Sequence, residues 1–219
     1  MKVEIWSDVI CPWCYVGKRR FDAALERFAH RDAVEVEWKS FELDPGSSSQ
    51  SPDGRSEGDY ADRLAEKYGT SRSGAQQMLD TMTTTAAAEG LELRFDKAIK
   101  ANTFDAHQVI HLARERGVQS EVKERLLRAY FTEGEAVGDM SVLARLGAEA
   151  GLDAPEVLQA IDEQRYAEAV RANEVEAQRL GISAVPFFIV DRTYGIAGAQ
   201  PPDQILEVLK QAWSQSHPA

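Results

Sequence analysis

The stretch that decides the fold is IWSDVICPWCYVGKRRF, residues 5–21, which holds both cysteines of this 219-residue chain, Cys11 and Cys14. Residues 3–7 have the composition of a short strand. Beyond the cysteines, apolar residues recur at helical spacing and predict a helix to about Ala29. These apolar residues are Phe21, Ala24, Leu25 and Phe28. The C-x-x-C motif is therefore expected where a strand ends and a helix begins.

Strand patterns occur at both ends of the chain. Residues 34–38 alternate between apolar and charged side chains, so the opening segment predicts β-α-β with parallel strands. Near the other end, VPFFIV (185–190), a turn at 191–192 and TYGIA (193–197) predict a hairpin. A final helix is expected to start at Pro202.

The middle of the chain has a helical pattern. Residues 44–58 are rich in Gly, Ser and Pro and predict a surface connection. From residue 59 to residue 180 the pattern is helical, with Asn102 and Ser120 as expected N-caps. Gly90, Gly117, Gly134 and Gly151 are expected helix ends, and Pro155 suits a first turn.

This order predicts an α/β protein in which a helical block interrupts a mixed sheet. The first domain would comprise residues 1–44 and 181–219, and an inserted helical domain would comprise residues 45–180. With 43% hydrophobic residues, the chain has enough apolar side chains for a core that needs no disulfide.

Composition narrows the partners and the compartment. A net charge of −11 argues against nucleic acid, and the basic triplet at residues 18–20 is expected to be a solvated helix face. No segment has the length and hydropathy of a membrane span, and the N-terminus lacks the pattern of a secretory leader. We therefore expect a cytoplasmic protein, in which structural disulfides are rare and a cysteine pair favours catalysis, redox sensing or metal binding.

The position of the pair favours dithiol chemistry. Cys11 would lie at the positive end of the helix dipole, which stabilises a thiolate, and Cys14 would lie one turn further in. Lowering a thiol pKa from ~8.5 to ~7 corresponds to about 2 kcal/mol of preferential thiolate stabilisation. Pro12 fits the first helical turn because it lacks an N–H group. Cys11 is thus the expected nucleophile and Cys14 the resolving thiol.

Two other interpretations of the pair stay open. Zinc would need two further ligands, which His107 and His111 could supply from one helix face, although no short zinc-finger spacing is present. Alternatively, the cysteines could be buried as small apolar residues, although a turn beside Pro and Trp is a poor place for that. We therefore predict no bound metal ion.

The motifs together resemble the DsbA family of thioredoxin-fold oxidoreductases, in its FrnE-type branch. The resemblance rests on SDVICPWCYVGKRRF, on ANTFDAHQVIHLA (101–113), on VPFF and on GIAGAQPPDQI (195–205), and it spans nearly the whole chain. It implies a thioredoxin fold, β-α-β followed by β-β-α, with a large inserted helical domain.

The resemblance also implies roles for particular residues. Cys11 would be the nucleophile and Cys14 the resolving thiol, and Pro186 would follow a cis peptide bond after Val185 and face the disulfide. A cis bond before proline costs only about 0.5–1 kcal/mol. The backbone there would offer hydrogen bonds to a substrate strand. From the residues alone, a trans proline at the start of a strand is equally ordinary.

The residue between Pro12 and Cys14 departs from the strongly oxidising members of the family, which carry histidine there. Trp13 cannot supply a positive charge to the Cys11 thiolate. We therefore predict a reduction potential below about −120 mV and nearer to about −270 mV.

A related branch of the fold resembles 2-hydroxychromene-2-carboxylate isomerase and kappa-class glutathione transferase, which have serine at the position of Cys11. Two cysteines favour dithiol chemistry but leave room for a glutathione site. Asn102 matches a segment near the active site of that branch, although helix capping is the simpler role. Asp8 would either relay a proton to Cys14 or be a loop carboxylate.

The leading hypothesis is a thiol-disulfide oxidoreductase acting on protein or small-molecule disulfides. It would need no cofactor beyond its own redox-active cysteines, with glutathione as a candidate co-substrate. The alternatives are a glutathione-dependent isomerase or transferase, and a helical binding module whose C-x-x-C is vestigial or binds a metal. The sequence leaves the physiological substrate, the direction of electron flow and the oligomeric state open.

Overall fold

The computed structural model describes residues 1–47 and 59–217. Most of the connection predicted at residues 44–58 therefore lies outside the described residues. The boundaries of the inserted domain stay a prediction, because the largest apolar core joins side chains from both parts, such as Ile5, Phe188 and Leu126.

The described strands form one four-stranded sheet in the order β2-β1-β3-β4. The strands are β1 (Lys2–Ser7), β2 (Glu35–Ser40), β3 (Phe187–Val190) and β4 (Tyr194–Ala197). β1 and β2 run parallel with Ile5 opposite Trp38, and β1 and β3 run antiparallel with Ile5 opposite Phe188. The predicted hairpin between β3 and β4 is present, with positive φ at Asp191 and Arg192.

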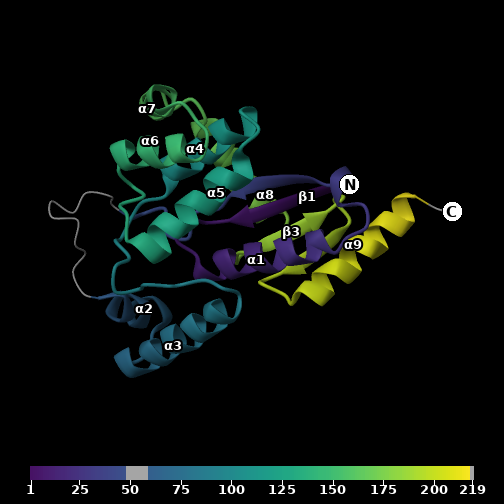
Figure 1. Cartoon of the computed structure of the whole chain (residues 1–219). Coiled ribbons are helices and arrows are strands. Elements are labelled where there is room, and N and C mark those ends of the chain that lie inside the picture. The colour runs from purple at the N-terminus through teal and green to yellow at the C-terminus, as the bar shows by residue number, and fades with distance from the viewer. Residues whose placement is uncertain (48–58, 218–219) are drawn as a thin grey trace.

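Two helices complete the thioredoxin-like part. α1 (Pro12–Glu26) makes the crossover between β1 and β2, and α9 (Pro202–Ser216) follows β4. The two helices lie side by side against the sheet (Figure 1). The predicted thioredoxin fold is confirmed, and within residues 1–47 and 59–217 its strands occur only in the two terminal parts.

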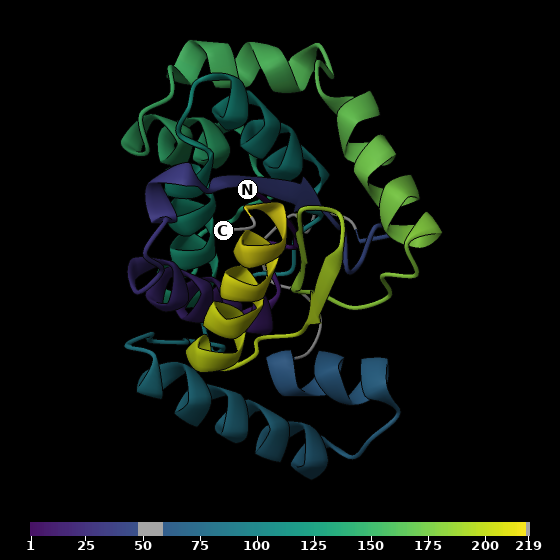
Figure 2. The ribbon, with the colours of Figure 1, turned by 90° about the vertical axis from the view of Figure 1, so that its right-hand side faces the viewer.

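The remaining described helices lie between β2 and β3 in sequence. They are α2 (Tyr60–Tyr68), α3 (Arg72–Ala88), α4 (Phe104–Glu115), α5 (Gln119–Arg128), α6 (Met140–Glu149), α7 (Ala154–Asp162) and α8 (Ala167–Arg179). A 3-10 turn (Arg31–Ala33) precedes β2, and a π-helical turn (Ala129–Glu133) extends α5. α2 and α3 lie at one end of the molecule and α6 and α7 at the other, with the sheet between them (Figure 2). No helix among the described residues has the length and apolar character needed to cross a membrane.

The helix ends mostly follow the predicted punctuation. The four glycines expected to end helices all have positive φ, which L side chains rarely adopt. Pro155 lies in the first turn of α7. The expected cap at Ser120 is wrong, because α5 begins at Gln119, with Val118 as its N-cap two residues before Ser120. The Ser120 hydroxyl instead accepts a hydrogen bond from the Trp38 indole at 3.0 Å.

The edge strand β2 is covered by two side-chain amides. Gln119 of α5 pairs with the Trp38 backbone as a neighbouring strand would: its Oε1 accepts from the Trp38 N–H at 2.9 Å and its Nε2 donates to the Trp38 carbonyl at 3.0 Å. Asn173 of α8 accepts from the Ser40 N–H at 3.0 Å. These contacts satisfy an edge that would otherwise be open to pairing with another chain.

Candidate active site: a buried dithiol

The cysteine pair lies where β1 leads into α1. Cys11 is the N-cap residue of α1, Pro12 occupies the first turn, and the Cys14 N–H donates to the Cys11 carbonyl at 3.0 Å. Both cysteines are free thiols. Cys11 is 4% exposed and Cys14 1% exposed, whereas the Trp13 side chain between them is 42% exposed. Cys11 is therefore the slightly more exposed residue of the pair, and Trp13 presents an indole at the surface beside it.

Val185 and Pro186 form a wall beside the first thiol. The peptide bond between them is cis. The Cys11 thiol lies 3.5 Å from the Val185 carbonyl oxygen, to which it donates. The pair thus lies beside the dithiol, although Val185 is some 170 residues from it in sequence.

Asp8 is a fully buried carboxylate beneath the dithiol. Its two oxygens accept from the Val9 N–H at 2.7 Å and the Leu43 N–H at 2.8 Å, and His107 Nε2 lies 3.4 Å away. Burial acts to raise the pKa of Asp8, but His107, the Leu43 N–H and the charge of Lys123 together lower it. Asp8 is therefore a buried, ionised group that belongs to the site.

Lys123 is the residue that sequence reasoning missed. It comes from α5, its side chain is 1% exposed, and its Nζ donates to the Ser7 carbonyl at 3.3 Å. Burial lowers the pKa of Lys123, while Cys14, Asp8 and Cys11 act in the opposite direction. A signal was present in the sequence: Lys123 falls on the face of α5 that carries Val122, Leu126 and Leu127, where an apolar residue is expected.

The two thiols titrate as a pair. The hydrogen bond with Cys14, together with burial, raises the pKa of Cys11 well above its ordinary value. Burial acts to raise the pKa of Cys14 as well, but the Cys11 hydrogen bond and the Lys123 charge lower it overall. The Lys123 charge thus favours negative charge on Cys14 over Cys11 in the resting dithiol. The expected stabilisation of a Cys11 thiolate by the start of α1 stays a prediction.

The two histidines considered as zinc ligands have different partners. His107 faces Asp8, and His111 Nε2 lies 3.1 Å from the Ser40 hydroxyl. Burial, assisted by His107, lowers the pKa of His111 to about 4. Within residues 1–47 and 59–217, no group of three or more His, Cys, Asp or Glu side chains is arranged to hold a metal ion.

Asn102 anchors a loop and a helix start. Its Nδ2 donates to the Pro45 and Ser47 carbonyls at 3.3 and 3.0 Å, and its Oδ1 accepts from the Phe104 N–H at 2.9 Å. The N-cap residue of α4 is Thr103, so the expected cap at Asn102 is off by one residue, and Asn102 binds the first helical N–H from the position before the cap.

The basic triplet of α1 is not a solvated face. Lys18 is buried and pairs with Asp22 and Glu124, Arg19 also pairs with Glu124, and Arg20 pairs with Glu89. The expectation was wrong because α3 and α5, which pack beside α1, supply carboxylates to this face.

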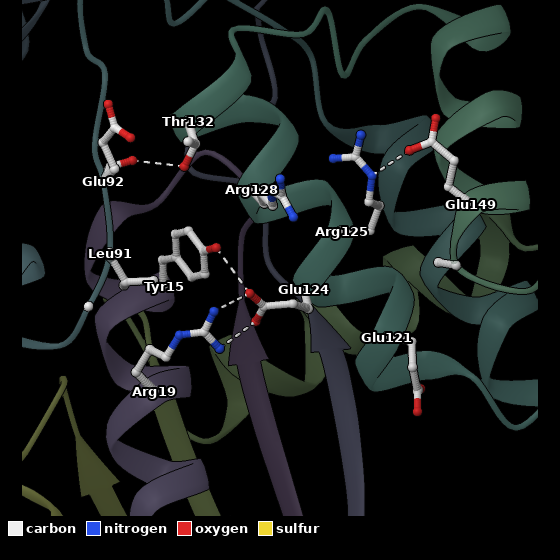
Figure 3. Close-up of a pocket in the computed structure, with 12 residues that line it drawn as sticks. Tyr15, Arg19, Leu91, Glu92, Glu121, Glu124, Arg125, Arg128, Thr132 and Glu149 are labelled. Carbon is white, nitrogen blue, oxygen red and sulfur yellow. Dashed lines mark hydrogen bonds and ion pairs between the residues drawn. The ribbon is translucent and has the colours of Figure 1, made fainter.

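A groove of about 660 Å³ lies beside α1, away from the thiols. In Figure 3 the Tyr15 hydroxyl and the Arg19 guanidinium both point at Glu124, and Arg125 points at Glu149. The arginines that line it are already paired with glutamates, so the groove offers an incoming anion little charge. The dithiol is the stronger candidate site.

A cysteine pair at the start of the first helix, beside a cis-proline loop of a thioredoxin fold, places the chain in the class of DsbA-like thioredoxin-fold proteins. Comparison with known proteins agrees: residues 2–210 match the family of DSBA-like thioredoxin domains, and the chain belongs to that family. It is 31% identical to the uncharacterised protein YwbO of Bacillus subtilis over 203 residues, which is 92% of each chain.

Solved structures give the same result. A probable DsbA oxidoreductase from Streptomyces coelicolor is 44% identical and superposes with a TM-score of 0.90, covering 100% of this chain and 92% of that one. The cytosolic disulfide reductase DsbM from Pseudomonas aeruginosa, determined with GSH, is 17% identical with a TM-score of 0.68, covering 97% of this chain and 99% of that one. The second likeness concerns the fold alone.

Proposed function

We propose that this protein is a thiol-disulfide oxidoreductase in which Cys11 attacks a substrate disulfide and Cys14 resolves the mixed disulfide. The observation that carries the proposal is the arrangement of two free thiols at the start of α1, with the slightly more exposed residue, Cys11, against the Val185 carbonyl. Membership of the DsbA-like family supports this chemistry.

In the first step, the Cys11 S–H passes its proton to the Cys14 thiolate as Cys11 attacks. A Cys11–substrate S–S bond forms, the substrate S–S bond breaks, and one substrate thiolate leaves. In the second step, Cys14 gives that proton to the first substrate thiolate and attacks the Cys11 sulfur, which releases the second substrate thiolate. The substrate gains two electrons and the protein is left with a Cys11–Cys14 disulfide; the reverse sequence oxidises a substrate dithiol.

Asp8 and Lys123 suit the proton steps. Lys123 stabilises negative charge on Cys14, while Asp8 is a buried carboxylate held in place by two backbone N–H groups. Both act next to the sulfurs in surroundings from which water is largely excluded, where charges interact more strongly than in bulk water.

The substrate would meet an apolar and aromatic surface around Cys11. Phe41, Leu43 and Phe187 are half-buried and pack against the cluster that contains both cysteines. Together with the exposed Trp13, this surface suits an extended polypeptide or a small thiol compound such as glutathione. The DsbM structure with GSH supports glutathione as a co-substrate to be tested, and a cytoplasmic location remains our prediction.

Insulin reduction by the purified protein tests the proposal. Wild type should reduce insulin when supplied with a thiol reductant, and Cys11→Ser should reduce the rate to the uncatalysed background. Trp213→Phe, a change far from the dithiol in α9, is the matched control. Glutathione-dependent turnover of an isomerase substrate by Cys11→Ser, with no insulin reduction by wild type, would favour the isomerase alternative instead.

A further inference from the structure

Gly17 marks a close approach between α1 and the cis-proline loop. Glycine is a poor helix former, yet Gly17 is buried in the interior of α1. A Cβ atom at this position would lie 2.8 Å from Pro186 Cγ and 3.6 Å from Ala199 Cβ. The helix therefore uses glycine here so that two separate loops can lie directly on its surface.

The segment Gly198-Ala199-Gln200 holds the cis-proline loop. The Gly198 N–H donates to the Pro186 carbonyl at 2.9 Å. Gly198 has φ of +75°, a backbone conformation that favours glycine. The motif that contributed to the family resemblance is thus in direct backbone contact with the wall of the active site.

Arg20 joins this segment to the inserted helices. Its Nη1 donates to the Ala199 carbonyl at 2.7 Å, and its Nε pairs with Glu89, the C-cap residue of α3, at 2.6 Å. The Arg20 side chain is only 18% exposed, so both contacts are shielded from solvent. A planar guanidinium can hold two acceptors at fixed angles, which a lysine amine cannot do.

We propose that Arg20 is a positioning residue: it fixes the Gly198–Gln200 segment, and through it the Val185–Pro186 wall, at the distance from Cys11 that exchange requires. The contacts run from Arg20 to Ala199, from Gly198 to Pro186, and from Val185 to the Cys11 thiol at 3.5 Å. The importance of this distance for catalysis rests on the proposed function. The anchoring of the loop, and its effect on the Cys11 thiol, does not.

The neighbouring arginine is a matched control. Arg19 lies on the same helix and also pairs with a glutamate, Glu124, but no contact of its side chain reaches the Ala199 segment among the described residues. Arg19→Ala therefore removes an equal charge and an ion pair from α1 while leaving the loop anchored.

The test uses a Cys14→Ala background, so that Cys11 is the only thiol, and measures the rate of alkylation by iodoacetamide between pH 5 and pH 10. In Arg20→Ala the Val185 carbonyl should move away from the Cys11 S–H, so the neutral thiol loses its hydrogen-bond acceptor. The pH midpoint of the alkylation rate, which reports the pKa of Cys11, should therefore fall by about half a unit. Loss of a cation alone would move the midpoint upwards. Asp8 and Lys123, which also face the thiol, are unchanged in these variants.

Arg20→Lys and Glu89→Gln should lower the pH midpoint of alkylation as well, but by less than Arg20→Ala does. They replace Arg20→Ala in the test if that variant does not fold. With both cysteines present, Arg20→Ala should lower kcat/KM for insulin reduction about tenfold, because small displacements at a reacting centre are costly. Arg19→Ala should leave both measurements at the wild-type values.

The outcomes separate the two hypotheses. A lowered midpoint in a protein that reduces no disulfide would support the positioning role and overturn the proposed function. Active variants at Arg20 and Glu89 with a midpoint equal to that of wild type, or raised, would overturn the positioning role and leave the proposed function standing.

Discussion

At the scale of single residues, the site depends on charges that the C-x-x-C motif does not reveal. Asp8 lies in the loop that follows β1, and Lys123 lies on α5. Both are buried, and they lie close to the two thiols. Isolated buried charges are costly unless they are paired or hydrogen-bonded. Their burial beside the sulfurs therefore gives the dithiol a fixed electrostatic environment.

Replacing Lys123 by methionine tests that environment. Lys123→Met should raise the pH at which the first thiolate forms by about one unit, because a buried positive charge near the sulfurs is lost. Thiolate absorbance at 240 nm against pH gives the midpoint. Lys67→Met, at an exposed position of α2, is the control and should leave it unchanged. An unshifted midpoint in folded Lys123→Met would show that the amine does not influence the thiols.

Trp13 sets the second prediction at this scale. An indole gives the Cys11 thiolate no positive charge, so the couple should equilibrate with glutathione at a midpoint nearer to about −270 mV than to about −120 mV. Trp13→His should make the protein more oxidising. Trp13→Phe, which supplies no charge either, should stay near the wild-type midpoint. A wild-type midpoint near about −120 mV would refute the role assigned to Trp13.

At the scale of elements, the sequence predicts the strands, the helix ends and the hairpin because each depends on local chemistry: alternation, glycine and proline. Lys123 and the pairing of Gln119 with β2 were not predictable in the same way, since both depend on how α5 packs on the sheet. The Lys18–Arg20 triplet was misjudged for the same reason. Its partners Glu89 and Glu124 lie on α3 and α5, far away in sequence.

The edge of β2 gives a prediction for an element. Gln119→Ala leaves the buried N–H and C=O groups of Trp38 without the amide partner, which should cost about 1–3 kcal/mol of folding free energy. Urea unfolding at neutral pH measures it. Gln178→Ala on the exposed face of α8 should change stability by less than about 0.5 kcal/mol. Equal effects of the two substitutions would mean that the Gln119 amide does not secure the edge.

At the scale of the whole molecule, buried titratable groups make the free energy of unfolding depend on pH. The pKa of His111 is about 4 in the folded protein, below its ordinary value of 6.5. The unfolded chain therefore binds more protons between these values, so His111 makes stability fall as the pH drops from 6.5 towards 4. The pKa of Glu42, which burial and Glu174 raise to about 7, acts with the opposite sign.

The contribution of His111 is isolated by difference. His111→Gln can still hydrogen-bond to the Ser40 hydroxyl but does not titrate. Between pH 6.5 and pH 4, wild type should lose up to about 3 kcal/mol of folding free energy through His111, and the variant should lack this loss. Urea unfolding at several pH values compares it with wild type. His30→Gln, at an exposed position, should keep the wild-type slope. A slope in His111→Gln identical to wild type would contradict the pKa direction.

The central claim concerns the division of labour between the two sulfurs, and intact-protein mass spectrometry after brief exposure to oxidised glutathione tests it directly. Wild type should end as the Cys11–Cys14 disulfide with no adduct, Cys14→Ala should keep one glutathione in disulfide linkage to Cys11, and Cys11→Ser should react far more slowly. A stable adduct on wild type, or rapid adduct formation at Cys14 in Cys11→Ser, would contradict the assignment of Cys11 as the nucleophile and Cys14 as the resolving thiol.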